Sequence, residues 1–527
     1  MKKRTIILIF SLFFVLVFSQ NAFAAEEKKL LLVYDSLNIA GEKQADIDSL
    51  QRLLTTMGAE VVTTTDNTYV AGELNDNQFY GVISFVNWDE KGLQSNVFED
   101  DRKQFTGKKL HIGLDIAEDE KSGFEGTWRA LSHRQFTLIH EEKNYQELLD
   151  YQDQSLVLET NIGTRFGVLT SQELDEKEYP FGVIQGKNGF LPMYSHSGAV
   201  FLQASELIHR WLEGTKTYQP MLTFNQMNPL IDMETAEWFE EELADLADYY
   251  AVSTTSVNQN SEVLSFKRFT DLLRKMQTQQ SAAVFLSVPA VNAANTSDNR
   301  ILGQLMNQQI SLLVGQNVFP IGVSAPGYWN QDADYQADAL AIANSVILEE
   351  NPHDEAIFYR VQTNQSKIYD TAFYSLADSE LDGIEWLTNS QYTDYKFSMP
   401  VSYGYTFPKT KKEGQQLLDK LNASFLNFTH PFDTQYTYSI ETQTQLIEIK
   451  NGQLLLNRVP VEELTTIKDT EIPSVSTDGL FSTFYNLTNN LLISIIVITI
   501  VILIILFIRG RRNYRAKFIR SERGKKK

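Results

Sequence analysis

Two separate stretches of this chain alternate apolar runs with amphipathic helical segments, and this pattern constrains the fold more than any other feature of the sequence. In the first stretch, KLLLVYDS, EVVTTTD, YGVISFV and KLHIGLD predict buried strands, and GEKQADIDSLQRLLTTMG predicts a helix that ends at Gly58. Strands that alternate with helices are typical of a parallel sheet covered by helices. We therefore expect an α/β protein whose N-terminal domain, residues 28–215, is a parallel α/β sandwich ending with the helix SELIHRWLEG.

A second alternating series begins at Pro220. The expected strands are MLTF, YAVSTTSV, AAVFLSV, FPIGVS and ASFLNF, and helical stretches such as METAEWFEEELADLADYY and SFKRFTDLLRKMQT lie between them. Strand-helix repeats of this length predict a complete or incomplete (β/α) barrel over residues 218–460, which would bind its ligands at the C-terminal ends of the strands. The periodicity fades after Pro460, so residues 461–490 are expected to form a stalk.

Both ends of the chain carry segments typical of export and membrane insertion. Residues 1–24 combine a basic start, an apolar stretch and the motif Ala22-Phe23-Ala24, which predicts a signal peptide. Residues 491–508 are uncharged and would measure roughly 27 Å as a helix, which predicts one transmembrane helix. The tail, residues 509–527, holds ten Lys or Arg against one Glu, and the positive-inside rule places it in the cytoplasm. We expect a single-pass type I protein of the cell membrane that contacts lipid through this span and tail, with most of the chain extracytoplasmic.

Charge and cysteine content exclude several classes of function. The whole chain carries a net charge of −21, and removing the +3 of the signal peptide and the +9 of the tail leaves −33 on the exported part. A nucleic-acid partner is not expected, because a phosphate backbone requires a basic surface. An acidic exported domain is suited to a cationic polymer, although net charge speaks mainly to solubility. The chain has no cysteine, which excludes disulfides, thiol catalysis and thiolate metal sites.

The strand ends of the N-terminal domain offer only a weak site. Ligands of such domains bind beyond the carboxyl ends of the strands, where Asp35, Ser36 and Asp115 would lie. No glycine-rich phosphate loop is present there, so we favour helix capping as the role of these side chains. The domain also looks like flavodoxin and glutamine amidotransferase domains. Because the amidotransferases that it resembles use a cysteine nucleophile, we expect no amidase activity.

Four segments of the second domain carry a resemblance to a known family. They are LTFNQMNPL, VFLSVPAV, PIGVSAPGYWN and SFLNFTHPFD, in this order along the chain. In order and spacing they resemble an uncharacterised polysaccharide-deacetylase-like family of bacterial envelope proteins. This family is a branch of the metal-dependent carbohydrate deacetylase superfamily. The resemblance implies an incomplete (β/α) barrel of the polysaccharide deacetylase type.

The same resemblance implies that the family's metal and catalytic groups are missing here. Asn225 and Gln226 stand where the family has an aspartate base and an aspartate metal ligand. Gly327 stands where the third segment of the family has a histidine, the second segment has no histidine, and His430 is kept in the fourth. Neutral carboxamides bind a divalent cation poorly and cannot act as bases near neutral pH, and one histidine cannot hold zinc. We therefore expect no metal, no cofactor and no catalytic residue.

Recognition of a sugar is what these strand ends can still provide. Carboxamides pair with hydroxyl groups, and aromatic rings stack on the apolar faces of sugars. The candidate glycan-binding residues, expected to converge at one barrel mouth, are Asn225, Gln226, Tyr328, Trp329, His430 and Asp433. Helix capping by the carboxamides, packing of the aromatic rings in the core and a buried structural role for His430 remain open alternatives.

From these features we expect a membrane-anchored, catalytically inactive relative of polysaccharide deacetylases. It would bind or scaffold an extracellular or wall polysaccharide during biosynthesis or export, with polysaccharide-export proteins as expected partners. One alternative is an active carbohydrate deacetylase or hydrolase with a relocated site that uses Asp433, Asp35 or Asp115. A second alternative is a protein-binding envelope component without affinity for sugars.

Overall fold

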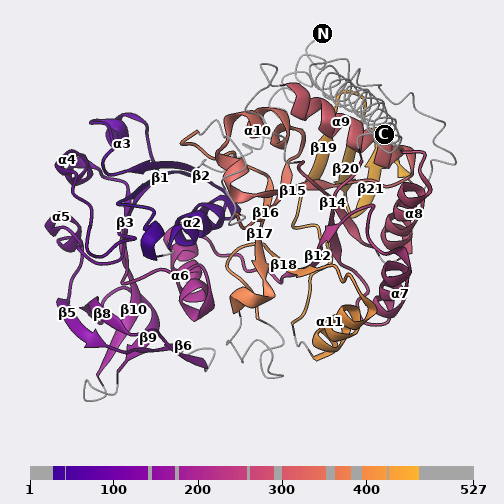
Figure 1. The fold of residues 1–527 in the computed structure, drawn as a ribbon. Coiled ribbons are helices and arrows are strands. Elements are labelled where there is room, and N and C mark those ends of the chain that lie inside the picture. The colour runs from indigo at the N-terminus through magenta and orange to yellow at the C-terminus, as the bar shows by residue number, and fades with distance from the viewer. Residues whose placement is uncertain are drawn as a thin grey trace, which may run out of the picture. The chain divides into compact units, whose positions relative to one another are not determined.

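The computed structural model describes residues 28–461 except 42, 141–144, 172–176, 258–260, 280, 290–299, 352–362, 382–394 and 424–425. All of these residues belong to one compact unit. Figure 1 shows an N-terminal α/β domain in indigo to magenta and a barrel domain in magenta to yellow.

The N-terminal domain is built on a nine-stranded mixed sheet with the order β2-β1-β3-β4-β11-β10-β9-β6-β7. Its strands are β1 (Lys28–Tyr34), β2 (Ala59–Thr65), β3 (Gly81–Phe85), β4 (Lys108–Ile112), β6 (Thr137–His140), β7 (Tyr145–Leu148), β9 (Thr164–Thr170), β10 (Glu178–Gln185) and β11 (Asn188–Leu191). A separate antiparallel pair is formed by β5 (Thr127–Arg134) and β8 (Gln152–Glu159).

The predicted purely parallel sandwich is therefore wrong for this domain. Strands β2, β1, β3, β4 and β11 are parallel, whereas β10, β9, β6 and β7 pair antiparallel. The physical reason lies in the short connections. Gly186, with φ +60°, forms a two-residue turn between Gln185 and Asn188, and a turn this short can only join antiparallel strands.

Helices cover both faces of the sheet (Figure 1). They are α2 (Gln44–Thr56), α3 (Glu73–Asp76), α4 (Asn96–Gln104), α5 (Glu118–Lys121) and α6 (Gly198–Trp211), with a 3-10 turn η1 (Ile39–Gly41). Alternate residues of β1 pack into two separate clusters, Leu30 and Leu32 with α2 and α6, and Leu31 and Val33 with α3 and α4. This two-sided burial explains the continuous apolar run of the strand.

Helix α2 is buried on more than its sheet-facing side. Ten of its thirteen residues are buried, including the polar Asp48, Ser49 and Arg52. A helix that only covers a sheet keeps its polar face in water. The polar face of α2 instead packs against the barrel domain, where the Ser49 hydroxyl lies 2.8 Å from the Tyr374 hydroxyl.

The barrel domain contains seven parallel strands that close into a barrel. The strands are β12 (Met221–Met227), β13 (Ala251–Thr254), β14 (Ala283–Ser287), β15 (Gly322–Pro326), β16 (Ser345–Glu349), β17 (Thr371–Ala377) and β18 (Val401–Thr406). The predicted incomplete barrel is wrong, because β12 pairs with both β13 and β18, from Met221↔Ser402 to Asn225↔Thr406. Closure gives the backbone groups of both end strands their partners.

Helices surround these strands (Figure 1). They are α7 (Met233–Ala244), α8 (Leu264–Gln279), α9 (Arg300–Gly315), α10 (Ala333–Asp338) and α11 (Lys411–Ala423), with 3-10 turns η3 (Gly327–Gln331), η4 (Leu340–Ile342) and η6 (Asp378–Leu381). Asp232 caps α7 by accepting a hydrogen bond from Thr235 N, 3.1 Å away. This cap ends the connection that leaves β12 and places the loop 228–232 beside the barrel's C-terminal end.

The last predicted strand, ASFLNF, is not part of the barrel. Residues 426–437 have no regular structure, and an antiparallel sheet follows with β19 (Tyr438–Glu441), β20 (Leu446–Lys450), β21 (Gln453–Leu456) and β22 (Val459–Pro460). Tyr436 and Tyr438 pack against Met221, Phe285 and Phe373 and thereby fill the N-terminal end of the barrel. The opposite end, where the strands finish, is the open mouth.

The predicted terminal segments lie outside the described residues. These are the signal peptide 1–24, the stalk 461–490 beyond its first residue, the transmembrane helix 491–508 and the basic tail 509–527. In the part of the chain that the structure describes, no helix has the length and apolar character needed to cross a membrane. The expected fold is corrected accordingly to a mixed α/β fold with a closed seven-stranded parallel barrel and no described membrane span.

Candidate functional site

A cavity of about 880 Å³ opens at the C-terminal ends of the barrel strands. Residues from β12, β13, β14, β16 and β17 and from the segments that follow them line it. Its polar lining consists of Asn225, Gln226, Asn228, Ser253, Thr255, Ser256, Ser287, Glu349, Glu350, Ser375 and Glu380. We call this cavity the barrel mouth.

Three serines and one glutamate form a hydrogen-bonded cluster at its base. The hydroxyl of Ser253 lies 2.9 Å from that of Ser287 and 2.6 Å from that of Ser324. Ser253 also donates to Glu349 Oε1 at 3.3 Å. The four residues come from the consecutive strands β13, β14, β15 and β16, so the barrel itself brings them together. Burial raises the pKa of Glu349, and the hydrogen bonds from Ser253 and Ser324 oppose this shift.

Glu380 follows the neighbouring strand, β17, in the short turn η6. Its Oε2 accepts a hydrogen bond from the backbone N–H of Ala377 at 2.5 Å. Its Oε1 is buried and has no hydrogen-bond partner among the described residues. Burial raises the pKa of Glu380 to about 7, with Arg52 opposing the shift and the carboxylate of Glu350 adding to it. Glu380 is therefore poised to change its protonation state near neutral pH.

Arg52 brings a buried cation from the N-terminal domain to this end of the barrel. It is only 2% exposed, and its Nε donates to Asp48 Oδ2 at 2.8 Å within α2. Its Nη1 donates to the carbonyl oxygen of Ser375 at 3.3 Å, and its guanidinium lies 4.4 Å from the centre of the Tyr374 ring. Its positive charge interacts electrostatically with Glu349 and Glu380 and opposes the rise of their pKa values. The N-terminal domain thus places a buried cation beside the barrel mouth, although none of its residues lines the cavity.

The two carboxamides that sequence reasoning singled out do line the barrel mouth. The pairing of β12 with β13 is interrupted by an irregularity between Phe224 and Met227, and Gln226 adopts φ +63° there. The Asn225 side chain lies over Gly404, where an added Cβ would come within 2.9 Å of Nδ2. A bulge with a left-handed non-glycine residue costs free energy, and such features are concentrated at functional sites.

The remaining predicted residues do not join this pair. Thr429 N donates to the carbonyl oxygen of Pro220, and the ring of His430 lies 4.9 Å from that of Tyr249, so this segment packs where β12 and β13 begin. Asp433 accepts from the backbone of Tyr436, which fills the same N-terminal end. His430 and Asp433 therefore lie at the opposite end of the barrel from Asn225.

Tyr328 and Trp329 lie in η3, directly after β15, and their side chains are outside what the structure describes. The preceding Gly327 explains why no histidine follows this strand. A Cβ on Gly327 would lie 2.7 Å from both Arg52 Cγ and Asp48 Oδ1. The space that a side chain would need is filled by α2.

Sequence reasoning missed Glu349, Glu350 and Glu380, although a signal for the first two was available. SVILEE is an apolar run that ends in two carboxylates, which is the kind of strand end that drew attention to MLTFNQ. No comparable signal exists for Glu380, because it lies three residues beyond the strand and reaches the cavity only through the turn η6.

The N-terminal strand ends have a structural role. Asp35 is 1% exposed and accepts hydrogen bonds from the backbone N–H groups of Asn87 at 2.7 Å and Trp88 at 3.1 Å. It thus fastens the loop after β3 and does not cap a helix. Asp115 lies in a left-handed turn with φ +57°, beside Gly92. Neither carboxylate lines the barrel mouth.

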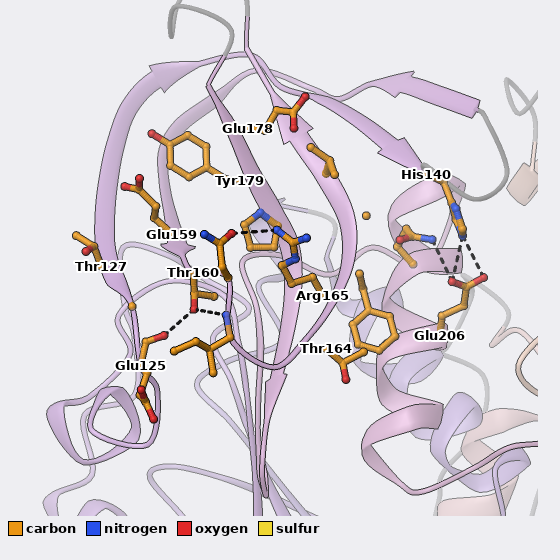
Figure 2. Close-up of a pocket in the computed structure, with 18 residues that line it drawn as sticks. Glu125, Thr127, His140, Glu159, Thr160, Thr164, Arg165, Glu178, Tyr179 and Glu206 are labelled. Carbon is orange, nitrogen blue, oxygen red and sulfur yellow. Dashed lines mark hydrogen bonds and ion pairs between the residues drawn. The ribbon is translucent and has the colours of Figure 1, made fainter.

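A second cavity, of about 930 Å³, lies in the N-terminal domain among β8, β9, β10 and α6 (Figure 2). Several of its charged groups are already paired. Glu159 lies 2.7 Å from both Arg129 and Lys177, and His140 lies 3.2 Å from Glu206. Beside the barrel mouth Arg52 is paired with Asp48, and the three glutamates that line the cavity have no ion-pair partner within 4 Å among the described residues. We therefore take the barrel mouth as the candidate site.

The metal centre that the deacetylase resemblance implies does not fit these residues. Carboxamides occupy the positions of the two aspartates, and no histidine lines the barrel mouth. Across the described residues, no group of three or more His, Cys, Asp or Glu is arranged to hold a metal ion. No protein-family model matches the chain, and no curated protein sequence matches it either. The resemblance stays a prediction.

Proposed function

We propose that the barrel mouth binds a carbohydrate polymer that contains amino sugars. The observation that carries this proposal is the composition of the cavity, in which hydroxyl, carboxamide and carboxylate groups from at least five strands or strand ends converge. Each of these groups pairs with sugar hydroxyls, as donor, acceptor or both. A volume of about 880 Å³ also falls within the range of small-molecule sites.

The preference for amino sugars follows from charge. Glu349, Glu350 and Glu380 all line the cavity, and the guanidinium of Arg52 beside it is shared with Asp48. A protonated amine on the sugar would give the ionised carboxylates among them the partner that the described residues do not provide. The net charge of −33 that remains without the two basic terminal segments favours the approach of a cationic polymer in the same way.

The cellular setting of the proposal comes from the N-terminal segment alone. Residues 1–24 have the pattern of a signal peptide, so we place the binding site outside the cytoplasm. The polymer would then be a wall polysaccharide or an exopolysaccharide, and the proteins that export it are the partners to expect.

Calorimetric titration of the full-length protein with chitosan oligomers tests the proposal. Cellulose oligomers of equal length serve as the uncharged comparison. We expect Asn225→Ala combined with Gln226→Gly to weaken binding at least about 10-fold, since each lost hydrogen bond contributes about 1 kcal/mol. Glycine is chosen at position 226 because it tolerates φ +63°.

A matched control comes from the other cavity. Arg165→Ala removes a charged side chain that lines the N-terminal cavity shown in Figure 2, and it should leave the affinity unchanged. Equal affinity of the wild type and the double variant for chitosan oligomers would reject the barrel mouth as the site. Absence of binding to every oligomer would favour a protein-binding component instead.

A further inference from the structure

We infer that the barrel mouth also cleaves the polymer that it binds, with Glu380 as the general acid and Glu349 as the general base in hydrolysis of a glycosidic bond. The inference rests on the proposed function, because it places the bond to be cleaved in the same cavity. It differs from both expectations drawn from the sequence, which were an inactive protein and, as the alternative, a hydrolase that uses Asp433, Asp35 or Asp115.

The two glutamates are placed by neighbouring strands of one rigid barrel. Glu349 is the last residue of β16, and Glu380 follows β17, which pairs with β16 in the register Leu348↔Tyr374. Both side chains line the same cavity at the C-terminal end of the barrel. Catalytic groups of parallel barrels come from the ends of different strands in this way.

The surroundings of the two carboxyl groups differ in the sense that acid-base catalysis requires. Burial raises the pKa of Glu349, but the hydrogen bonds that it accepts from Ser253 and Ser324 oppose this rise and favour its ionised form. Glu380 accepts one backbone hydrogen bond on Oε2 and has a pKa of about 7, so a large share of it is protonated at neutral pH. Environments that separate two carboxyl groups are the pattern of an acid and a base.

One oxygen of Glu380 is in an environment that a solvent-exposed acidic residue does not have. Its Oε1 is buried and has no hydrogen-bond partner among the described residues. Leaving a buried polar atom unpaired costs about 1–3 kcal/mol, and such atoms in folded proteins call for an explanation. Because Oε1 is covered, the carboxyl group has to rotate toward the cavity that Glu380 lines before a glycosidic oxygen can receive its proton and supply the missing partner.

The reaction balances without any further reactant. As the bond between the anomeric carbon and the glycosidic oxygen breaks, Glu380 gives its proton to that oxygen. A water oxygen forms the new bond to the anomeric carbon, and Glu349 takes the proton released by the water. Proton exchange with solvent then restores both carboxyl groups. The buried cation of Arg52 opposes the rise that burial causes in the pKa values of both carboxyl groups.

The test uses the full-length protein and two kinds of probe. One is a set of oligomers of glucosamine, N-acetylglucosamine, galactosamine and N-acetylgalactosamine in α and β linkage, assayed for new reducing ends. The other is the set of 2,4-dinitrophenyl glycosides of the same sugars, whose leaving group departs without a proton. Glu349→Gln should slow both about 100-fold or more. Glu380→Gln should slow oligomer cleavage about 100-fold or more but dinitrophenyl release less than 10-fold.

A structural role for Glu380 would not produce this split between leaving groups, so equal losses on both probes would overturn its assignment as the acid. Glu441→Gln, an exposed glutamate at the end of β19, is the control that should keep full activity. Calorimetry with the same oligomers separates the two proposals. Binding without any cleavage by the wild type would reject hydrolysis and keep the binding proposal, whereas absence of binding and cleavage would reject both.

Discussion

The guanidinium of Arg52 lies 4.4 Å from the centre of the Tyr374 ring, so a helix of the N-terminal domain stacks directly on a strand of the barrel. The contact continues on the same helix, where the Ser49 hydroxyl lies 2.8 Å from the hydroxyls of both Tyr374 and Tyr194. The N-terminal domain therefore packs beside the barrel mouth through α2, although none of its residues lines the cavity.

Replacing Arg52 should destabilise the protein more than the loss of its contacts alone. Arg52→Met keeps much of the side chain's volume but leaves Asp48 buried without its 2.8 Å partner. Removing one member of a buried ion pair typically costs 3–5 kcal/mol, and we expect a loss of about 3 kcal/mol in the free energy of unfolding at pH 7. Urea denaturation followed by circular dichroism measures it.

The companion variant tests the reason for this loss. In Asp48→Asn with Arg52→Met no unpaired charge remains, so part of the lost stability should return. The contrary outcome is additivity, in which the double variant loses the sum of the free energies that the two single variants lose. The two residues would then be independent, and the ion pair would not explain the loss.

A side chain at position 327 should disturb the contact between the domains. The Cβ of Gly327→Ala would lie 2.7 Å from Arg52 Cγ and 2.7 Å from Asp48 Oδ1, both of which are buried. Overpacking of this kind costs about 1–3 kcal/mol, and thermal unfolding should show a lower midpoint. Gly315→Ala at the end of α9 has no heavy atom within 4 Å of its new Cβ and should be neutral or slightly stabilising. Equal thermal unfolding midpoints for Gly327→Ala and Gly315→Ala would contradict the close packing of Gly327 against α2.

The sequence was informative where a segment's local pattern decides its structure. The continuous apolar run of β1 and the helical pattern of α2 identify a helix-covered sheet, and MLTF and AAVFLSV lie in β12 and β14. The hydrophobic pattern of a strand does not show which other strands it pairs with. Closure of the barrel depends on β12 meeting β18 across about 180 residues of sequence, and no local feature of either strand records that pairing.

The candidate site shows the same limit. Asn225 and Gln226 were found because they end an apolar run, whereas Glu380 reaches the cavity through a 3-10 turn. The predicted position of His430 at the barrel mouth is wrong because the apolar residues of ASFLNF resemble a barrel strand. Residues 426–430 instead form an irregular segment that packs where the barrel strands begin. The contribution of Arg52 could not be foreseen, since it depends on how two separately recognised domains contact each other.

Acid should weaken the N-terminal domain through Glu120. This residue is 3% exposed and lies 3.1 Å from His111 Nδ1 and 3.2 Å from Arg102 Nη1. Burial alone would raise its pKa, but His111 and Arg102 outweigh burial and hold the pKa at about 2. A carboxyl group with a lower pKa in the folded state stabilises the protein above its unfolded pKa of about 4.3. This stabilisation, about 3 kcal/mol, is lost as the pH falls from there toward 2.

Glu120→Gln should remove this stabilisation at pH 7 and flatten the loss of stability below pH 4. Urea denaturation at pH 7, 4 and 3 measures both effects. Glu118→Gln, whose side chain is 87% exposed on the same short helix, should change the free energy of unfolding by less than about 0.5 kcal/mol. An acid dependence shared by wild type and Glu120→Gln would show that other carboxyl groups dominate.

Glu380 should have the opposite linkage to pH, because burial raises its pKa to about 7 while Arg52 only partly offsets the shift. A carboxyl group with a higher pKa in the folded state costs nothing below its unfolded pKa of about 4.3. It destabilises the protein progressively as the pH rises from there to about 7. Glutamine imitates the protonated form, so Glu380→Gln should be more stable than wild type to urea at pH 8, by about 3 to 4 kcal/mol in the free energy of unfolding, and nearly as stable as wild type at pH 4. Functional residues whose burial destabilises the folded protein commonly give higher stability when they are replaced, at the expense of activity. The control Glu441→Gln should match wild type at both pH values, and a Glu380→Gln variant without any gain at pH 8 would mean that the carboxyl group ionises freely in the folded protein.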